Sequence, residues 1–212
     1  MLTGTVSVII RLWGCNLKCR WCDEKNSSMP GIGYTLSLKD LIKKIAKYNC
    51  KNIVITGGEP LIHHDIVALT NELKKRGYFI TIETNATIIK NVSCDLISMS
   101  PKLSHSVSED IKRYENHEGL IKIDVIKYYI KKYDYQIKFV VEHEKNFNEI
   151  ENILSKIGNY NRSNVLIMPL ASSRKQLLKI QKKVAEMCIK RNWRYCNRLQ
   201  LQIWGKNKET KK

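Results

Sequence analysis

The chain has 212 residues, of which 43% are hydrophobic, and a formal net charge of +17. This length fits a single domain, which we place at residues 1–205, and the lysine-rich end at 206–212 is expected to be a disordered basic tail. No apolar run approaches the roughly 20 residues that span a bilayer, and no export signal opens the chain, so a membrane protein is excluded and a cytoplasmic location is expected.

Apolar runs alternate with helical patterns along the whole chain. Strands are predicted at residues 5–12, 52–55, 79–83, 96–99, 136–141 and 165–168. Helices are predicted at residues 37–48, 65–76, 117–132, 147–157 and 175–191, with Ser37 as an N-cap and Gly77 closing the second helix. This α/β alternation indicates a parallel sheet of about six strands. Six are too few for the closed eight-stranded barrel, so we expect an open, partial β/α barrel with its site at the carboxyl ends of the strands.

Three cysteines follow the first predicted strand in the stretch GCNLKCRWC: Cys15, Cys19 and Cys22. Thiolates are soft ligands that suit iron, and three of them within eight residues can hold a cubic four-iron, four-sulfide cluster. Three protein ligands leave one iron open, where a reagent can bind and be reduced. A structural zinc ion is the less favoured alternative, because zinc needs a fourth ligand from elsewhere in the chain.

Short polar motifs stand at the ends of the next three predicted strands. Their residues are Gly57, Gly58 and Glu59, then Glu83, Thr84 and Asn85, then Ser100 and Lys102. Because parallel strands end at one rim of a barrel, we expect these residues to converge there with the cysteines. Lys138 lies inside the fifth predicted strand and faces either the barrel interior or solvent.

With its three-cysteine loop and the Gly-Gly-Glu-Pro motif at residues 57–60, the chain resembles the radical S-adenosylmethionine (SAM) superfamily. The resemblance implies that the open iron is chelated by the methionine part of SAM, and that an electron from the cluster cleaves the sulfonium to a 5'-deoxyadenosyl radical. It implies a flavodoxin- or ferredoxin-type electron donor. It also implies cofactor contacts from these residues: Gly57, Gly58, Glu59, Glu83, Thr84, Asn85, Ser100 and Lys102.

Within that superfamily the chain resembles the 7-carboxy-7-deazaguanine synthase family through Arg11, GCNL at 14–17, WCD at 21–23, SPK at 100–102 and IWG at 203–205. This resemblance implies conversion of 6-carboxy-5,6,7,8-tetrahydropterin to 7-carboxy-7-deazaguanine with loss of ammonia, a lyase step toward queuosine- or archaeosine-type deazapurines for tRNA. It implies that Arg11 pairs bidentately with the substrate carboxylate beside Gly57, and that the enzyme is a homodimer.

The chain departs from the pattern of that family in three places. The glycine- and glutamate-containing substrate loop that usually precedes the first strand is missing, so either the true start lies upstream of Met1 or this is a shortened relative with an altered substrate site. Glu24 stands where a threonine or serine usually helps to bind Mg²⁺, and its hard carboxylate oxygens are expected to serve the same ion. Leu199 and Gln200 stand where a Leu-His pair is usual.

Two other functions share parts of the pattern. An activating enzyme for glycyl-radical enzymes would also carry the three-cysteine loop, but SPK and IWG argue against it. A non-catalytic iron-sulfur RNA-binding protein would be compatible with the net charge of +17 and would not cleave SAM. Because the lysines are spread over the predicted helices without a basic stripe, we expect no dedicated nucleic-acid site.

Overall fold

The computed structural model describes residues 2–24, 33–107 and 120–205, and seven parallel strands form one sheet in it, in the order β1 to β7. The strands are β1 (Val8–Leu12), β2 (Asn52–Gly57), β3 (Phe79–Thr84), β4 (Leu96–Met99), β5 (Tyr135–Val141), β6 (Val165–Pro169) and β7 (Arg194–Tyr195). In the described residues the edge strands β1 and β7 do not pair with each other. The predicted open, partial β/α barrel is confirmed, with seven strands rather than about six.

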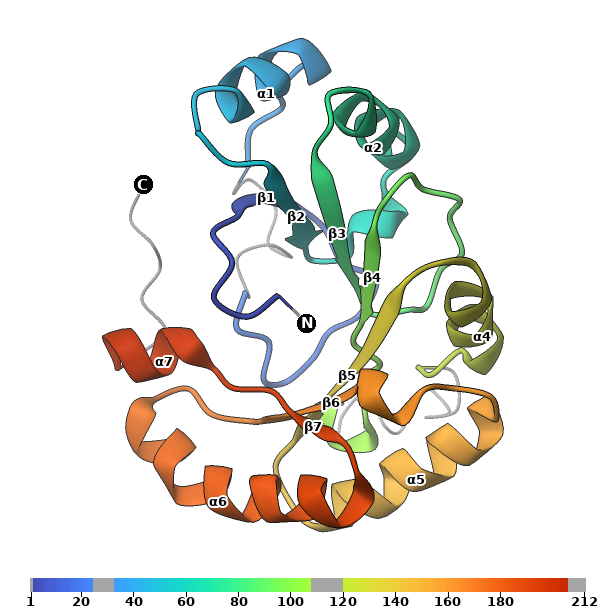
Figure 1. The fold of residues 1–212 in the computed structure, drawn as a ribbon, viewed down its shortest axis with the longest axis vertical. Helices are drawn as coiled ribbons and strands as arrows, with labels where there is room; N and C mark the ends of the chain where they lie inside the picture. Colours follow the sequence, from blue (N-terminus) through green and yellow to red (C-terminus); the bar gives the residue numbers. More distant parts are fainter. Residues whose placement is uncertain (1, 25–32, 108–119, 206–212) are drawn as a thin grey trace.

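The helices lie around the outside of the curved sheet (Figure 1). They are α1 (Leu38–Ile45), α2 (Ile66–Lys75), α4 (Ile123–Lys132), α5 (Lys145–Ile157), α6 (Arg174–Arg191) and α7 (Leu199–Trp204). Three short 3-10 turns complete the described elements: η2 (Pro60–Ile62), η3 (Ser104–Ser106) and η5 (Arg162–Asn164). None of the described helices is long and apolar enough to cross a membrane.

The two faces of the sheet differ in chemistry because side chains alternate along a strand. The outer face buries the hydrophobic core against the helices with residues such as Ile55, Ile82, Ile97, Ile137, Phe139 and Ile167. The inner face carries a polar row across neighbouring strands. In the strand register Arg11 stands opposite Thr56, Glu83 opposite Ser98, and Ser98 opposite Gln136. A polar site can therefore form inside the barrel without opening the core.

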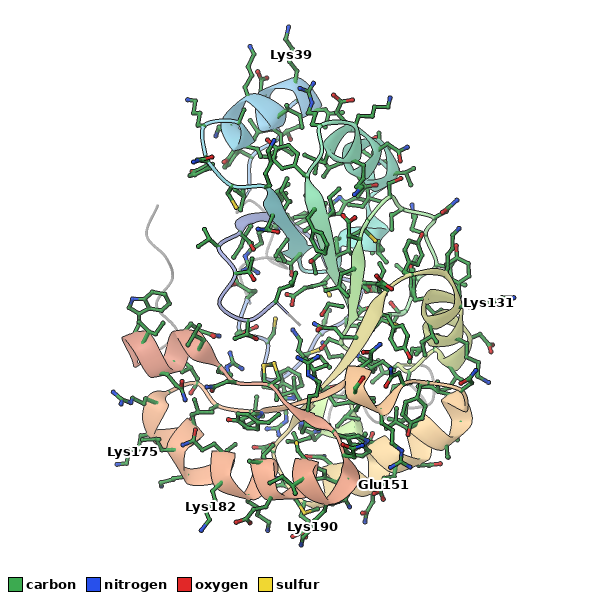
Figure 2. The ribbon with its side chains drawn as sticks, in the orientation of Figure 1. Lys39, Lys131, Glu151, Lys175, Lys182 and Lys190 are labelled. Atoms are coloured by element: carbon green, nitrogen blue, oxygen red, sulfur yellow. The ribbon has the colours of Figure 1, made fainter. Side chains whose placement is uncertain are left out.

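Charged side chains occupy the solvent side of the outer helices. Figure 2 shows Lys39 on α1, Lys131 on α4, and Lys175, Lys182 and Lys190 on α6 projecting away from the sheet. They belong to three separate helices, so these lysines contribute to the net charge without forming one stripe.

Several element boundaries differ from the sequence predictions by up to three residues, for example β1, predicted at 5–12 and observed at Val8–Leu12, and one helix and two short elements differ by more. The helix predicted at 117–132 begins only at Ile123, residues 120–122 are not helical, and 117–119 lie outside the described residues. Strand β7 has two residues and helix α7 has six, too short to be recognised from periodicity. The predicted basic tail at 206–212 also lies outside the described residues.

Candidate active site

The loop that carries the cysteines lies against the Gly-Gly-Glu motif, as expected for residues at one rim. The backbone N–H of Gly58 donates to the carbonyl of Leu12 over 3.1 Å, and that of Glu59 donates to the carbonyl of Gly14 over 2.8 Å. These two bonds continue the pairing of β1 with β2 beyond the last residue of each strand. The start of the cysteine loop is thereby fixed to the end of β2.

Gly57 and Gly58 are the residues that make this approach possible. Gly57 has φ +141, and a Cβ there would lie 1.9 Å from the carbonyl oxygen of Leu12. A Cβ on Gly58 would lie 1.9 Å from the carbonyl oxygen of Gly14 and 2.8 Å from the Cβ of Cys15. From the sequence we expected these glycines to admit the methionyl part of SAM. The structure adds a requirement of the protein itself, because no other residue lets the cysteine loop pack here.

Glu59 is fully buried and joins the segment after β2 to the end of β3. Its Oε1 accepts from the N–H of Leu61 over 3.0 Å and from the Thr84 hydroxyl over 2.8 Å, and its Oε2 accepts from the N–H of Asn85 over 2.6 Å. Burial raises the pKa of the Glu59 carboxyl, and the three hydrogen bonds oppose that shift. These hydrogen bonds are the partners that a role of Glu59 in fixing the loop requires.

Asn85 connects β3 to the cysteine loop. Its side-chain Nδ2 donates to Oδ1 of Asn16 over 2.9 Å, and the Asn16 Nδ2 donates to the hydroxyl of Thr87 over 2.8 Å. Oδ1 of Asn85 accepts from the N–H of Thr87 over 3.0 Å. Asn16 was not among the predicted site residues, although it belongs to the GCNL stretch. Its role depends on a partner 69 positions away.

Cys15, Cys19 and Cys22 lie within electrostatic reach of one another. Burial raises the pKa of the Cys15 and Cys19 thiols, and a charge on Cys22 raises both further. Within the described part of the chain, no three His, Cys, Asp or Glu side chains are close enough to hold a single metal ion. Three soft donors from one loop fit an iron-sulfur cube, whose iron would hold the sulfurs as thiolates.

Lys102 places a half-buried cation beside this loop. Its ammonium donates to the carbonyl of Ser100 over 2.7 Å and to the Ser100 hydroxyl over 2.9 Å, and it lies 5.8 Å from the centre of the Trp21 ring. Burial lowers the pKa of Lys102, while the nearby Cys19 and Glu59 favour its charged form. A positive charge here can offset the negative charge of thiolate ligands.

A second group of contacts holds the far end of the cysteine loop. The Trp21 ring stacks on His105, with centroids 5.8 Å apart, and Nε of Arg20 donates to the His105 carbonyl over 2.6 Å. Arg20 also forms an ion pair with Glu142, which follows β5, and the Asn146 amide lies 3.2 Å from Nδ1 of His105. His105 was not predicted as a site residue, because histidines without a spacing pattern carry no signal in the sequence.

Lys138 faces the inside of the barrel. Its ammonium lies 2.9 Å from Oε1 of Glu83, and the Glu83 Oε2 accepts from the Thr56 hydroxyl over 3.4 Å. The charge of Lys138 lowers the pKa of Glu83. Although burial alone would lower the pKa of Lys138, its pairing with Glu83 raises it. An ion pair therefore lies on the inner face below the rim.

Two further ion pairs involve the acidic residues that follow Cys22. The Arg11 guanidinium lies 3.2 Å from Oε1 of Glu24, and that of Arg198 lies 2.9 Å from Oδ2 of Asp23. Arg11 and Glu24 were predicted to bind a substrate carboxylate and Mg²⁺ respectively. The structure brings these two residues together. Arg198 was not predicted, since nothing in the local sequence links it to Asp23.

The fold and the cysteine loop define a class of protein that comparison with known families confirms. The model of the radical SAM superfamily matches residues 9–171, so the chain belongs to that superfamily, whose members use a 4Fe-4S cluster and SAM. Within it, the chain belongs to the 7-carboxy-7-deazaguanine synthase family. The synthase of Rhodopirellula baltica is 36% identical over 99% of this chain and 83% of its own length, and that of Halobacterium salinarum is 34% identical over 99% and 87%.

Solved structures agree with this assignment. QueE from Escherichia coli has a TM-score of 0.69 and 25% identity, covering 92% of this chain and 86% of that one. SuiB from Streptococcus suis, bound to its precursor peptide, has a TM-score of 0.60 at 17% identity over 90% of this chain and 48% of its own, a likeness of fold alone. Of the three functions left open by the sequence, the comparisons support a radical SAM enzyme of the deazaguanine synthase type.

The Glu59 contacts predict a cost for the nearly isosteric change Glu59→Gln. An amide nitrogen would replace one acceptor and face an N–H or hydroxyl donor, so we expect the free energy of unfolding to fall by about 1–3 kcal/mol. Urea unfolding under anaerobic conditions measures this. Glu186→Gln, which removes the exposed partner of Lys182 on α6, is the control and should change little. Equal stability of the two variants would contradict the role given to Glu59.

The burial of His105 predicts that the free energy of unfolding depends on pH. Burial lowers the pKa of His105 to about 4, against 6.5 for a free histidine. Because the unfolded chain binds this proton more readily than the folded chain, protonation of His105 favours unfolding. The free energy of unfolding should therefore be unaffected by His105 above pH 6.5 and should fall as the pH drops toward 4, by at most about 3 kcal/mol.

Urea unfolding of wild type and His105→Gln between about pH 7 and pH 5 tests this window. The stability advantage of the wild type should shrink as the pH falls. His143→Gln, at an exposed position, serves as the control. If the stability curves of wild type and His105→Gln ran parallel, burial of neutral His105 would not be responsible for the pH dependence.

Proposed function

We propose that the protein converts 6-carboxy-5,6,7,8-tetrahydropterin to 7-carboxy-7-deazaguanine with release of ammonia. The observation that carries this proposal is the location of Arg11, on the inner face of β1 and just before the three-cysteine loop. A guanidinium in this place can pair with a carboxylate on a substrate held next to the cluster. The names of the relatives supply the identity of that substrate class, and the polar inner face is compatible with a fused heterocycle.

When bound, the cluster and SAM supply the radical that takes a hydrogen from the substrate. The protein's own contribution is to position the cluster, SAM and the substrate relative to one another. We propose that Cys15, Cys19 and Cys22 hold the cluster and that Lys102 offsets its charge. The rim residues exclude water from the reacting carbon, since the cysteine loop packs directly on the end of β2.

We propose two different roles for the predicted cofactor residues. Gly57, Gly58, Glu83, Ser100 and Lys102 are proposed to contact SAM, with Gly57 also beside the substrate. Glu59, Thr84 and Asn85 are proposed to act by shaping the rim. Their polar groups already bond within the protein: Thr84 donates to Glu59, and Asn85 donates to both Glu59 and Asn16.

The proposal also covers the metal ion, the oligomeric state, the electron donor and the use of the product. Mg²⁺ is proposed to bind at Glu24, whose carboxylate provides hard oxygen ligands on the edge of the same site. We propose that residues 1–205 act as one catalytic domain, that the enzyme works as a cytoplasmic homodimer, and that a flavodoxin- or ferredoxin-type protein supplies the electron. The product would serve queuosine- or archaeosine-type modification of tRNA.

Anaerobic reconstitution with iron and sulfide, followed by reduction with SAM and the carboxy-tetrahydropterin, tests the proposal. We expect 7-carboxy-7-deazaguanine in the wild-type reaction and none with Cys22→Ala, detected by mass spectrometry. Turnover should fall when Mg²⁺ is omitted, and full turnover without it would remove the ion from the mechanism. Cleavage of SAM without formation of the deazaguanine would refute the substrate while leaving the superfamily assignment intact.

A further inference from the structure

The cysteine loop bridges the two free edges of the open barrel. Strand β1 lies at one edge of the sheet and β7 at the other, and they do not pair within the described residues. Glu24 reaches Arg11 on β1, while its neighbour Asp23 reaches Arg198, three residues beyond β7. Two consecutive acidic residues therefore connect both edges to the loop that carries the cysteines.

The two ion pairs differ in how easily they separate. The Arg198 side chain is only 4% exposed, so separating it from Asp23 would leave a buried guanidinium without that partner. Arg11 and Glu24 are 40% and 39% exposed, and an exposed pair of that kind contributes little to stability. The Arg198 contact is the anchor, and the Arg11 contact is the one that can open.

We propose that Glu24 is an internal competitor for the substrate: its carboxylate occupies, on Arg11, the place that a substrate carboxylate takes. This inference rests on the proposed function, since it assumes that Arg11 binds that carboxylate. A ligand with a carboxylate replaces one ion pair of Arg11 with another. A ligand without one leaves the Arg11–Glu24 pair in place, so in the absence of Mg²⁺ Glu24 weakens the binding of carboxylated ligands but not that of similar neutral heterocycles.

The release of Glu24 connects the substrate to the proposed Mg²⁺ site. A carboxylate held by Arg11 is a poor ligand for a cation, because its charge is already compensated. Once the substrate has displaced Glu24 from Arg11, the Glu24 carboxylate can bind Mg²⁺, and Mg²⁺ bound to Glu24 in turn releases Arg11 for the substrate. Binding of the two is therefore mutually favourable, and the coupling is reciprocal. A threonine or serine in this position carries no charge and could not compete for Arg11.

Isothermal titration calorimetry tests the inference on the reconstituted protein with SAM bound and no Mg²⁺. The probe is 6-carboxypterin, an oxidised analogue of the proposed substrate. Removing the competing charge with Glu24→Gln should tighten its binding about two- to five-fold. Glu72→Gln, which breaks an exposed ion pair of 2.7 Å with Arg76 on α2, is the matched control and should bind as the wild type does. 6-Methylpterin, without the carboxylate, should bind wild type and Glu24→Gln equally.

The possible results separate this inference from the proposed function. Unchanged or weaker binding of 6-carboxypterin by Glu24→Gln overturns the inference alone, as does an equal tightening of 6-methylpterin. Failure of the wild type to bind 6-carboxypterin overturns both the inference and the proposed function. Addition of Mg²⁺ should tighten 6-carboxypterin binding to the wild type more than to Glu24→Gln, and equal gains would refute the coupling.

Discussion

The buried carboxylate of Glu59 is the contact on which the site depends most. An ionised group can be buried only if its oxygens are satisfied, and here two N–H groups and one hydroxyl, from η2 and from the end of β3, do so. Those bonds hold the ends of β2 and β3 together. From β3, Asn85 reaches Asn16, and from β2 the glycine pair packs against the start of the cysteine loop. The position of the three thiols is thus set by a polar network whose centre has no contact with solvent.

A polar interior is unusual for a folded chain of this size, and the alternation along the strands explains how it is tolerated. The core lies outside the sheet, between strands and helices, so the inner face is free to carry charge. Charges there are paired: Lys138 with Glu83, Arg198 with Asp23, and Arg11 with Glu24. The cations of these pairs differ in exposure, since Lys138 and Arg198 are 16% and 4% exposed and Arg11 is 40% exposed. Arg11 is therefore the cation of the three that a ligand can reach most easily.

The sequence predicted the features that depend on local pattern. Hydrophobic periodicity predicted the strands. The cysteine loop and the motifs at the strand ends were recognised because cysteine, glycine and glutamate in these patterns have few chemical roles. The contacts that hold the site together do not, because they join distant positions: Asn16 with Asn85, Trp21 with His105, and Asp23 with Arg198. Lys138 could not be oriented from its own strand, since the residues around it are apolar on both sides, and its direction is set by Glu83. Strand β7 and helix α7 are too short to produce a periodic signal and are formed by packing on β6 and α6.

The most direct test of the central claim is whether one iron of the cluster is left for SAM. Mössbauer spectroscopy of protein reconstituted with ⁵⁷Fe, recorded before and after SAM is added, distinguishes an iron that changes its ligands from those held by cysteine. We expect a single iron site to change when SAM binds, while the sites held by Cys15, Cys19 and Cys22 stay as they were. A spectrum unaltered by SAM, or iron bound without sulfide, would contradict the claim that three cysteines hold a cluster with one open corner.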